Sequence, residues 1–442
     1  MKLIHEAVEK HEKLILDAER HIWKNPETGY KEFKTNEYMI ARFLELGYDV
    51  RRAEGITGFY TVVDTGRDGP EVLVLCELDS VICPEHPESD KETGAVHACG
   101  HNAQCAALLG VAAALTEDGV LDSMSGRIRL CAVPAEELLE IEYRRKLKEE
   151  GKISYFGGKS EFLSRGYFDG VDIALMVHTS KSFMSLLGSA GCIAKNIIYK
   201  GKAAHAGGSP QNGINALYAA SLGLNAINAI RETFREIDQV RVHPIITSGG
   251  SMVNAIPETA RLESYVRGRS FEAIEKENKK VNRALIGAAL SIGANIEIID
   301  IPGYAPLDND KNMLDMAKRA YLELFPDREF NIASGYSTGS TDMGDLSQIM
   351  PVIHPYSKGS VGDAHGANYY IDDPYSACVE CAKWQVAMLH MLLSDKAREA
   401  IRIKNEFTPR FASKEEYLNY LDSIASSGDR ITYTENGAEV KL

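Results

Sequence analysis

Short apolar segments alternate with helical segments between residues 72 and 178, and this alternation restricts the chain to few folds. The segments Val72–Cys76, Arg127–Val133 and Ile173–His178 read as buried strands, and residues 102–118 between the first two read as a helix. Strands separated by helices pair in parallel, so their carboxyl ends meet at one edge of a sheet. We therefore expect an α/β domain with a mixed, mostly parallel sheet that is covered by helices on both faces.

Polar side chains follow the ends of these strands. Glu77 and Asp79 follow the first strand, the adjacent pair Glu136 and Glu137 follows the second, and His178 ends the third. Carboxylates that an apolar strand delivers to a buried position are costly unless metal ions or protons compensate. Neighbouring side chains of an extended segment point in opposite directions, so one glutamate can bind metal while the other faces a water molecule.

A thiol and two further imidazoles extend this set of metal-binding side chains. Cys99-Gly-His101 precedes the helix over 102–118, and the positive end of the helix dipole favours a thiolate at Cys99. His365 lies in a glycine-containing loop suited to closing a site, and His354 in Ile353-His-Pro is the second candidate for that position. The combination predicts a metal centre.

The pattern changes at Gly191. Here the sequence predicts a strand over 193–199, a helix over 213–235, strands over 240–246 and 260–266, a helix over 271–291 and a strand over 295–301. This β-α-β-β-α-β order is typical of a ferredoxin-like α+β domain. Further helices are expected over 2–24, 34–47, 311–324 and 374–394, and an appended helix within 411–423. We predict a discontinuous larger domain, residues 1–190 and 304–442, with residues 191–303 inserted into it.

Three residues of the inserted domain are candidates for contact with a ligand. His205 lies in a glycine-rich loop that spans 201–208, Asn254 supplies an amide, and Arg267 is able to hold a carboxylate with two parallel hydrogen bonds. Each has a structural alternative, as a loop cap or a surface residue. Because His205 lies in a separate domain, we expect that it does not bind metal itself.

Charge and cysteine usage exclude some classes of function. The formal charge of −14 argues against nucleic-acid and anionic membrane surfaces as partners, and no apolar run approaches the roughly 18 residues that span a bilayer. Eight cysteines without a secretory signal predict a reducing, cytoplasmic location. Cys378-x-x-Cys381 resembles half a zinc ribbon or a redox pair, but it lies on an apolar helical stretch and is expected to be two buried thiols.

The chain resembles the M20 metallopeptidase and amidohydrolase family, and within it the branch of hippurate hydrolases, indole-acetyl-amino-acid hydrolases and aminobenzoyl-glutamate hydrolase subunits. The motifs that carry the resemblance are Asn25–Phe33, His97–Asn102, Pro134–Glu137, Gly201–Asn215, Gly249–Pro257 and Gly339–Asp345. Together they cover most of the chain. The last of them points to the aminobenzoyl-glutamate and dipeptidase-like subgroup.

The resemblance implies two divalent metal ions (Zn, Mn, Co or Ni) and a homodimer formed through the inserted domain. The implied metal ligands are Cys99, His101, Glu137, His178 and His365. Glu136 is then the general base, and His205 reaches the site of the partner subunit to polarise the scissile carbonyl. Because Glu77-Leu-Asp79 replaces the His-x-Asp motif of other members, we expect Asp79 to support a ligand without binding metal itself.

Two departures from the family pattern affect substrate choice. Asn102 and Gln104 stand where many relatives of this branch have Asp and His. The paired glutamates are usually followed by glycines, whereas here Leu138 begins an insertion of about thirty residues that contains the charged run 140–151. We expect that run to be a solvated surface helix and the insertion to reshape the mouth of the pocket.

The leading hypothesis is hydrolysis of the amide bond of a small N-acyl or aminoacyl amino acid by metal-activated water. An M20-type dipeptidase is the alternative within the same chemistry. A metal-dependent binding protein without turnover, and an enzyme that uses Cys99 as nucleophile with His365, remain the alternatives from other classes.

Overall fold

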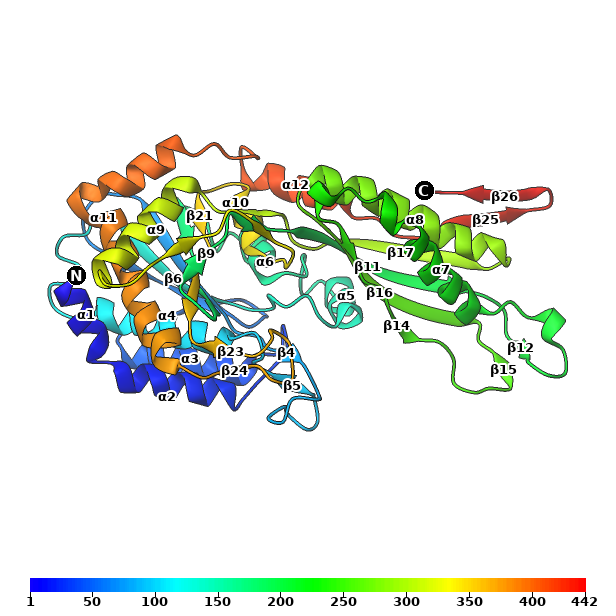
Figure 1. Cartoon of the computed structure of the whole chain (residues 1–442), viewed down its shortest axis with the longest axis horizontal. Coiled ribbons are helices and arrows are strands. Elements are labelled where there is room, and N and C mark those ends of the chain that lie inside the picture. The colour runs from blue at the N-terminus through cyan, green and yellow to red at the C-terminus, as the bar shows by residue number, and fades with distance from the viewer.

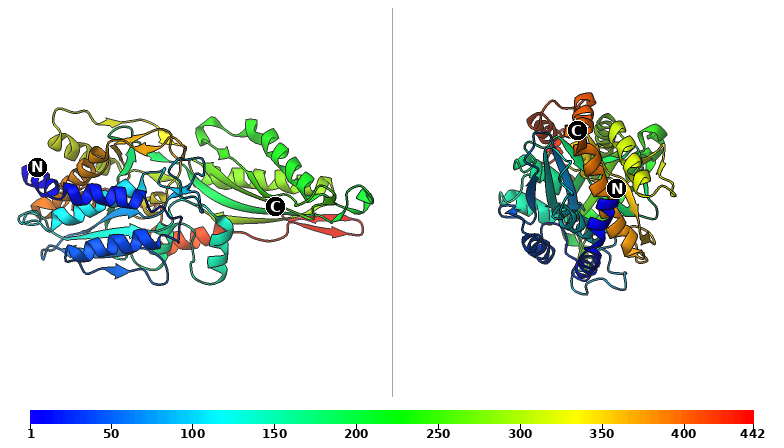
Figure 2. Two further views of the ribbon diagram at one scale, coloured as in Figure 1. Left: turned by 90° about the horizontal axis from the view of Figure 1, so that it is seen from below. Right: turned by 90° about the vertical axis from the view of Figure 1, so that its left-hand side faces the viewer.

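The computed structural model describes residues 1–442 as two lobes joined side by side (Figure 1). One lobe holds a sheet between helices, and the other holds a long antiparallel sheet with helices on one face (Figure 2). None of the helices is both long and apolar enough to cross a lipid bilayer.

The first lobe is built on a six-stranded sheet in the order β1-β2-β6-β3-β7-β21. Its strands are β1 (Arg51–Arg52), β2 (Phe59–Asp64), β3 (Glu71–Glu77), β6 (Arg127–Val133), β7 (Ile173–Leu175) and β21 (Val352–Ile353). Strand β3 pairs in parallel with β6 and β7, and β7 pairs in parallel with β21, whereas β2 runs antiparallel to β6. The predicted mixed, mostly parallel sheet is confirmed.

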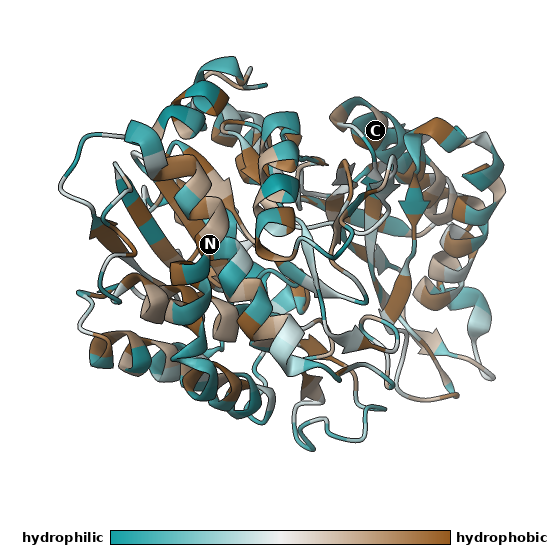
Figure 3. Cartoon of the chain, turned by 60° about the vertical axis from the view of Figure 1, so that its left-hand side comes forward, coloured by the Kyte–Doolittle hydropathy of each residue, from teal (hydrophilic) through white to brown (hydrophobic).

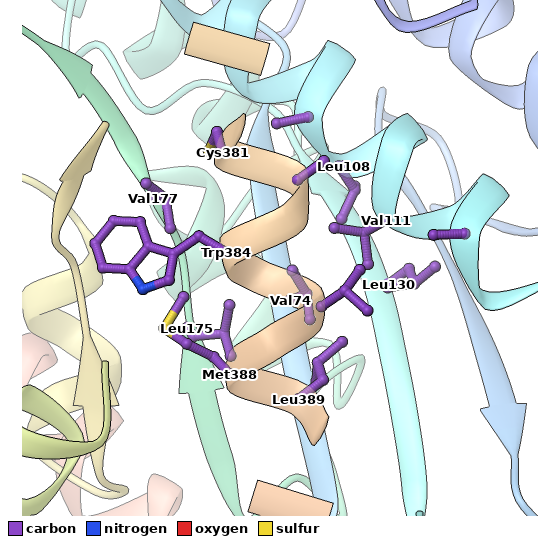
Figure 4. Packing of buried hydrophobic residues seen from close by; sticks show 14 of the residues in the cluster. Val74, Leu108, Val111, Leu130, Leu175, Val177, Cys381, Trp384, Met388 and Leu389 are labelled. Carbon is purple, nitrogen blue, oxygen red and sulfur yellow. The ribbon is translucent and has the colours of Figure 1, made fainter. Parts of the chain in front are cut away.

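Helices cover both faces of this sheet. Val72 and Val74 of β3 pack with α1 (Lys2–Glu9), α2 (Glu12–Trp23), α3 (Phe33–Glu45), α4 (His101–Leu115), α9 (Lys311–Leu324) and α11 (Cys381–Glu406). The alternate residues Leu73 and Leu75 pack with α6 (Gly158–Ser164), α10 (Met343–Ser347) and α12 (Lys414–Ile424). Figure 4 shows Trp384 of α11 in the first cluster, and Figure 3 shows the hydrophobic strands between helices whose outer sides are hydrophilic.

Two predicted helices are interrupted. The helix expected over 2–24 is α1 and α2, separated near Lys10 and His11, whose side chains both contact Glu117. The helix expected over 374–394 begins as a π-helix at Tyr375–Glu380 and extends beyond its predicted end, with non-helical residues at 394–397. Periodicity does not reveal such breaks, because the apolar face continues across them.

The second lobe contains a sheet in the order β13-β16-β11-β17, with β14 also paired to β16. Its elements are β11 (Gly191–Lys200), α7 (Ala216–Ile230), β13 (Arg241–Val242), β14 (Ile245–Ser248), β16 (Thr259–Gly268), α8 (Phe271–Ser291) and β17 (Asn295–Pro302). All pairings are antiparallel, and α7 and α8 pack against one another and against the sheet. This is the expected ferredoxin-like inserted domain.

The end of the chain lies against both lobes. Helix α12 packs on the first lobe. The hairpin of β25 (Ile431–Thr434) and β26 (Gly437–Val440) lies beside strand β17 of the second lobe. Isolated bridges join Glu297 to Asp429 and Asp300 to Ser426, and Ile431 is buried in the core of the second lobe. The predicted boundaries, with 304–442 assigned to the larger domain, therefore do not describe the contacts of the last residues.

Candidate metal and catalytic site

The paired glutamates lie in a tight turn directly after β6. Ala135 has a φ of +57°, a left-handed value that a residue with a Cβ rarely adopts. The turn buries both Glu136 and Glu137, which are 7% and 8% exposed. Such a backbone persists only where its surroundings hold it in place.

Four side chains from outside this turn hydrogen-bond to its backbone. Glu32 accepts a hydrogen bond from Ala135 N at 2.8 Å, and Asp79 accepts one from Glu137 N at 2.8 Å. The hydroxyl of Tyr304 donates to the carbonyl of Glu136. The fourth side chain, Arg144, donates to the carbonyls of Ala135 and Glu137.

Cys99 and His101 flank a glycine at the start of α4. Gly100 has a φ of +91°, which lets the chain turn sharply into the helix. His101 Nδ1 lies 2.9 Å from the carbonyl of Asp79, which leaves Nε2 directed elsewhere without a hydrogen-bond partner. Cys99 Sγ lies 3.4 Å from Nε2 of His178, the first residue of β8 (His178–Ser180).

His365 approaches the same point from a loop between β23 (Ser360–Val361) and β24 (Tyr370–Ile371). Its Nε2 lies 3.1 Å from Glu137 Oε1, and its backbone N donates to the carbonyl of Ala98 at 2.8 Å. The second candidate for this position, His354, is buried near His178 with both ring nitrogens unpaired and belongs to no cluster of metal-binding atoms.

The structure brings the five predicted ligands into two clusters. One cluster contains Cys99, His101 and His178, the other contains Cys99, Glu137 and His365, and the ligand atoms within each lie within 4.8 Å of one another. His101 Nε2 and Glu137 Oε1 are buried without hydrogen-bond partners, as expected for atoms that bind a metal ion. Thiolate, imidazole and carboxylate donors suit Zn, Mn, Co or Ni.

The environment separates the pKa values of the two adjacent glutamates. Burial, and then the charges of Glu77 and Glu137, raise the pKa of Glu136 well above its usual range. Burial alone would raise the pKa of Glu137, but the charges of His365 and His101 and the hydrogen bonds to it together lower that pKa to about 2. The two adjacent carboxyls therefore differ in their affinity for protons, and Glu136 is the one suited to take up and release a proton.

A buried lysine that the sequence did not suggest lies behind the clusters. Lys159 Nζ lies 2.5 Å from Glu77 Oε1 and also contacts Asp342, while Glu77 Oε2 lies 3.2 Å from His101 Nε2. Burial opposes ionisation of Glu77, but Lys159 together with His101 and His178 lowers its pKa to about 2. The sequence around Lys159, at the start of α6, carries no signal that would have singled it out.

Asp79 supports two of the predicted ligands. It is fully buried, it accepts the hydrogen bond from Glu137 N, and its Oδ1 lies 3.2 Å from His101 Nδ1. No cluster of metal-binding atoms includes Asp79. Its position fits the supporting role that the sequence suggested.

A cavity of about 570 Å³ opens beside the two clusters. Glu136 and Cys99 line it from the first lobe, and Tyr265 and Arg267 line it from β16 of the second. Arg267 Nη1 lies 3.4 Å from the Ser340 hydroxyl. A guanidinium group and the candidate metal ligands therefore face one space.

The other two candidates from the inserted domain lie elsewhere. His205 belongs to β12 (Ala204–His205), which pairs with β15 (Ala255–Ile256) at the far end of the second lobe (Figure 1). His205 is exposed and accepts hydrogen bonds only from Gly207 N and Gly208 N of its own loop. Asn254 is exposed beside it. A single chain does not bring either residue to the cavity.

All eight cysteines are free thiols. Cys378 and Cys381 are buried in the helical segment that the sequence indicated. Burial raises the pKa of both thiols, which makes them poor metal ligands and poor nucleophiles.

Comparison with known proteins places this geometry in a family. The model of peptidase family M20/M25/M40 matches residues 74–391. An Xaa-Arg dipeptidase of Mus musculus is 28% identical over 88% of this chain and 85% of its own, and an N-acetyl-L-cysteine deacetylase of Bacillus subtilis is 28% identical over 70% and 72%. The crystal structure of a dinuclear metal-binding M20 peptidase from Bacillus subtilis superposes with a TM-score of 0.63 at 19% identity, covering 87% of this chain and 99% of that one.

The number of protons released on metal binding tests whether His101 and His365 are metal ligands. The charge of Glu137, against the effect of burial, raises the pKa of His365 to about 11, and the pKa of His101 is also raised well above its usual range. Both imidazoles are therefore protonated near pH 7 and must lose a proton to bind metal. A proton lost on binding makes affinity rise with pH, so we expect Co²⁺ affinity to increase by about one to two powers of ten per pH unit from pH 6 to 8.

Titration calorimetry in two buffers of different protonation enthalpy counts the protons directly. Binding that releases no protons, with an affinity independent of pH in this range, would contradict the assignment of these two histidines.

Proposed function

The chain belongs to peptidase family M20/M25/M40, and from this membership we propose that it is a metal-dependent amidohydrolase that cleaves the amide bond of an N-acyl or aminoacyl amino acid. The observation that carries the proposal is the meeting of two clusters of metal-binding side chains with Glu136 at one cavity. The likeness to a deacetylase of N-acetyl-L-cysteine favours an acyl amino acid as substrate. The likeness to an Xaa-Arg dipeptidase favours the second candidate, an M20-type dipeptidase.

Cys99, His101, Glu137, His178 and His365 are the proposed ligands of two divalent ions, which are Zn, Mn, Co or Ni. When bound, such ions acidify water and polarise a carbonyl. Glu136 accepts a proton from the attacking water and delivers it to the departing amine. Its raised pKa suits it to hold that proton between the two steps.

Arg267 is the proposed binding residue for the carboxylate of the substrate. It faces the cavity from the inserted domain, and no carboxylate lies within 4 Å of its nitrogen atoms. A planar guanidinium holds a carboxylate through two parallel hydrogen bonds.

His205 and Asn254 are proposed to act in the partner subunit of a homodimer. The inserted domain exposes apolar side chains on α7 and β14, namely Tyr218, Leu222, Ile245 and Ile246, and β14 lies at an edge of its sheet. Exposed apolar residues beside an unpaired strand edge mark a surface that a second copy can cover. We assign residues 191–303 to this dimerisation domain and the rest of the chain, apart from its last hairpin, to the catalytic domain.

The location proposed for this enzyme is the cytoplasm, where its eight free thiols stay reduced. A binding protein without turnover, and a Cys99 nucleophile, are the competing hypotheses. Inactivation by a chelator with recovery on addition of Zn²⁺ or Mn²⁺ separates both from the proposed hydrolase, because neither predicts metal-dependent turnover.

Glu136→Gln tests the proposed base. The amide keeps the size of the side chain but accepts no proton, so we expect kcat to fall by roughly 10³-fold. Metal content, measured by elemental analysis, stays that of the unaltered protein. Glu149→Gln, an exposed change on α5 (Ile141–Glu149), serves as the control and keeps full activity on a panel of N-acyl amino acids and dipeptides. Turnover above a tenth of the original in Glu136→Gln rules out this role.

His205→Ala tests the sharing of sites between subunits. We expect this variant to be nearly inactive alone, because its exposed imidazole serves the other subunit. Mixing it with Glu136→Gln and allowing subunits to exchange creates one intact site in each mixed dimer, which restores up to about a quarter of full activity. Full activity of His205→Ala alone, or no recovery in mixtures whose exchange is verified by mass spectrometry, is incompatible with a shared site.

A further inference from the structure

Arg144 is a buried guanidinium group that the proposed mechanism does not use. It lies on helix α5, inside the insertion that follows Glu137, and it is 1% exposed. No carboxylate oxygen lies within 4 Å of its nitrogen atoms, although the helix around it is rich in acidic residues. A buried charge without an ionic partner is costly, so its hydrogen bonds must account for its position.

All of its hydrogen bonds go to backbone carbonyls. Nη1 donates to the carbonyl of Ala135 at 3.2 Å and to that of Phe156 at 2.8 Å, and Nη2 donates to the carbonyl of Glu137. Two of these three carbonyls flank Glu136. Arg144 therefore binds the turn on both sides of the proposed base, at the point where Ala135 has its left-handed backbone.

Neighbouring residues pack closely around the guanidinium group of Arg144. A Cβ on Gly29 would overlap it, and the ring of Tyr30 lies 5.6 Å from its central carbon. Helix α5 is fixed at its first turn by Glu140, which accepts hydrogen bonds from Thr28 Oγ1 at 2.7 Å and from Lys31 Nζ at 2.6 Å. The loop over residues 28–31 and the insertion thus enclose the catalytic turn from two sides.

We propose that Arg144 is a positioning residue for the paired glutamates. Its fork of N–H donors keeps the Ala135–Glu137 turn in the one backbone arrangement that directs Glu136 into the cavity and Glu137 toward His365. The insertion therefore does more than shape the mouth of the pocket, because it supplies a donor to the backbone carbonyls on both sides of Glu136. This inference rests on the proposed function for its catalytic part only, since the placement of Glu137 is also measurable through metal binding.

The alternative is that Arg144 only anchors the insertion through the carbonyl of Phe156. In that case its loss changes stability and the mouth of the pocket, but neither the backbone of the turn nor the metal ligands. The two readings differ in what happens to kcat relative to KM and to the coordination of a bound ion.

The test compares Arg144→Met with Arg145→Met. Arg145 is the next residue of the same helix and contacts only Glu142 and Glu149, so its variant controls for loss of a charge from α5. Each purified full-length variant is freed of metal and titrated with Co²⁺, whose absorption bands report thiolate and carboxylate coordination. Steady-state kinetics on the best substrate of the panel, and thermal unfolding, complete the comparison.

We expect Arg144→Met to lose about 100-fold in kcat, the cost of misplacing a catalytic group by about 1 Å, while KM stays within about threefold. Its Co²⁺ bands shift and its Co²⁺ affinity falls by about tenfold. Arg145→Met keeps the kcat, KM and Co²⁺ spectrum of the unaltered protein. Arg144→Lys retains the charge but not the planar fork, so we expect it to fold with kcat reduced by about tenfold.

A folded Arg144→Met or Arg144→Lys protein with unchanged kcat and an unchanged Co²⁺ spectrum overturns the proposal. So does a loss confined to KM, or failure of both variants to fold, since either result makes Arg144 a structural anchor. If instead the unaltered protein hydrolyses nothing on the panel, the proposed function fails, and the Co²⁺ spectra still decide whether Arg144 positions Glu137.

Discussion

Two adjacent carboxylates must be buried side by side at the end of one strand and yet face different partners, and the rest of the site depends on how this is achieved. The turn over residues 134–137 contains a left-handed Ala135, which bends the chain sharply just before the two glutamates. Every backbone polar group from Ala135 N to Glu137 O that has a described partner is bound by a side chain from elsewhere: Glu32, Asp79, Tyr304 or Arg144. The backbone N–H groups of Leu139 and Gly158 also donate to the carbonyls of Glu137 and Ala135, so the turn is held mainly by groups outside it.

The charged groups behind the site are likewise held by side chains from other segments. Lys159 is fully buried between Glu77 and Asp342, and Glu77 in turn approaches His101. A lysine in that position lets an acidic group remain ionised beside a histidine in a region from which water is excluded. Both Arg144 and Lys159 come from the segment between Glu137 and β7. That segment thus contributes cations to the site although it contributes none of the proposed ligands.

Much of the fold follows from the sequence, because it is local. The strands after residue 72 and the β-α-β-β-α-β order of the inserted domain have clear apolar patterns, and parallel strands place the groups that follow them at one edge. That pattern predicted that Glu77, Glu137 and His178 lie near one another, whereas the meeting of Cys99 with His365 was implied by the family resemblance. What the sequence could not reveal depends on contacts between segments. The run over 140–151 was expected to be a solvated helix, yet Ile141, Arg144 and Leu147 on one face of it are buried.

The placement of the terminal hairpin and of His205 shows the same limit at a larger scale. Nothing in the sequence of residues 426–442 indicates that they pack beside β17 of the second lobe and not on the first lobe, where α12 packs. The motif around His205 predicts a functional residue. Its separation from Glu136 within one chain results from the two-lobed shape, which no local sequence pattern predicts. A second subunit is the partner that the proposed mechanism requires.

The central claim is that five side chains from four separate segments hold a pair of divalent ions beside Glu136. Anomalous X-ray diffraction from crystals grown with Zn²⁺ or Mn²⁺, recorded on both sides of the absorption edge of the metal, tests it most directly. The account predicts two anomalous peaks per chain, one within reach of Cys99, His101 and His178 and the other within reach of Cys99, Glu137 and His365. A single peak, no peak, or peaks away from these side chains would contradict it.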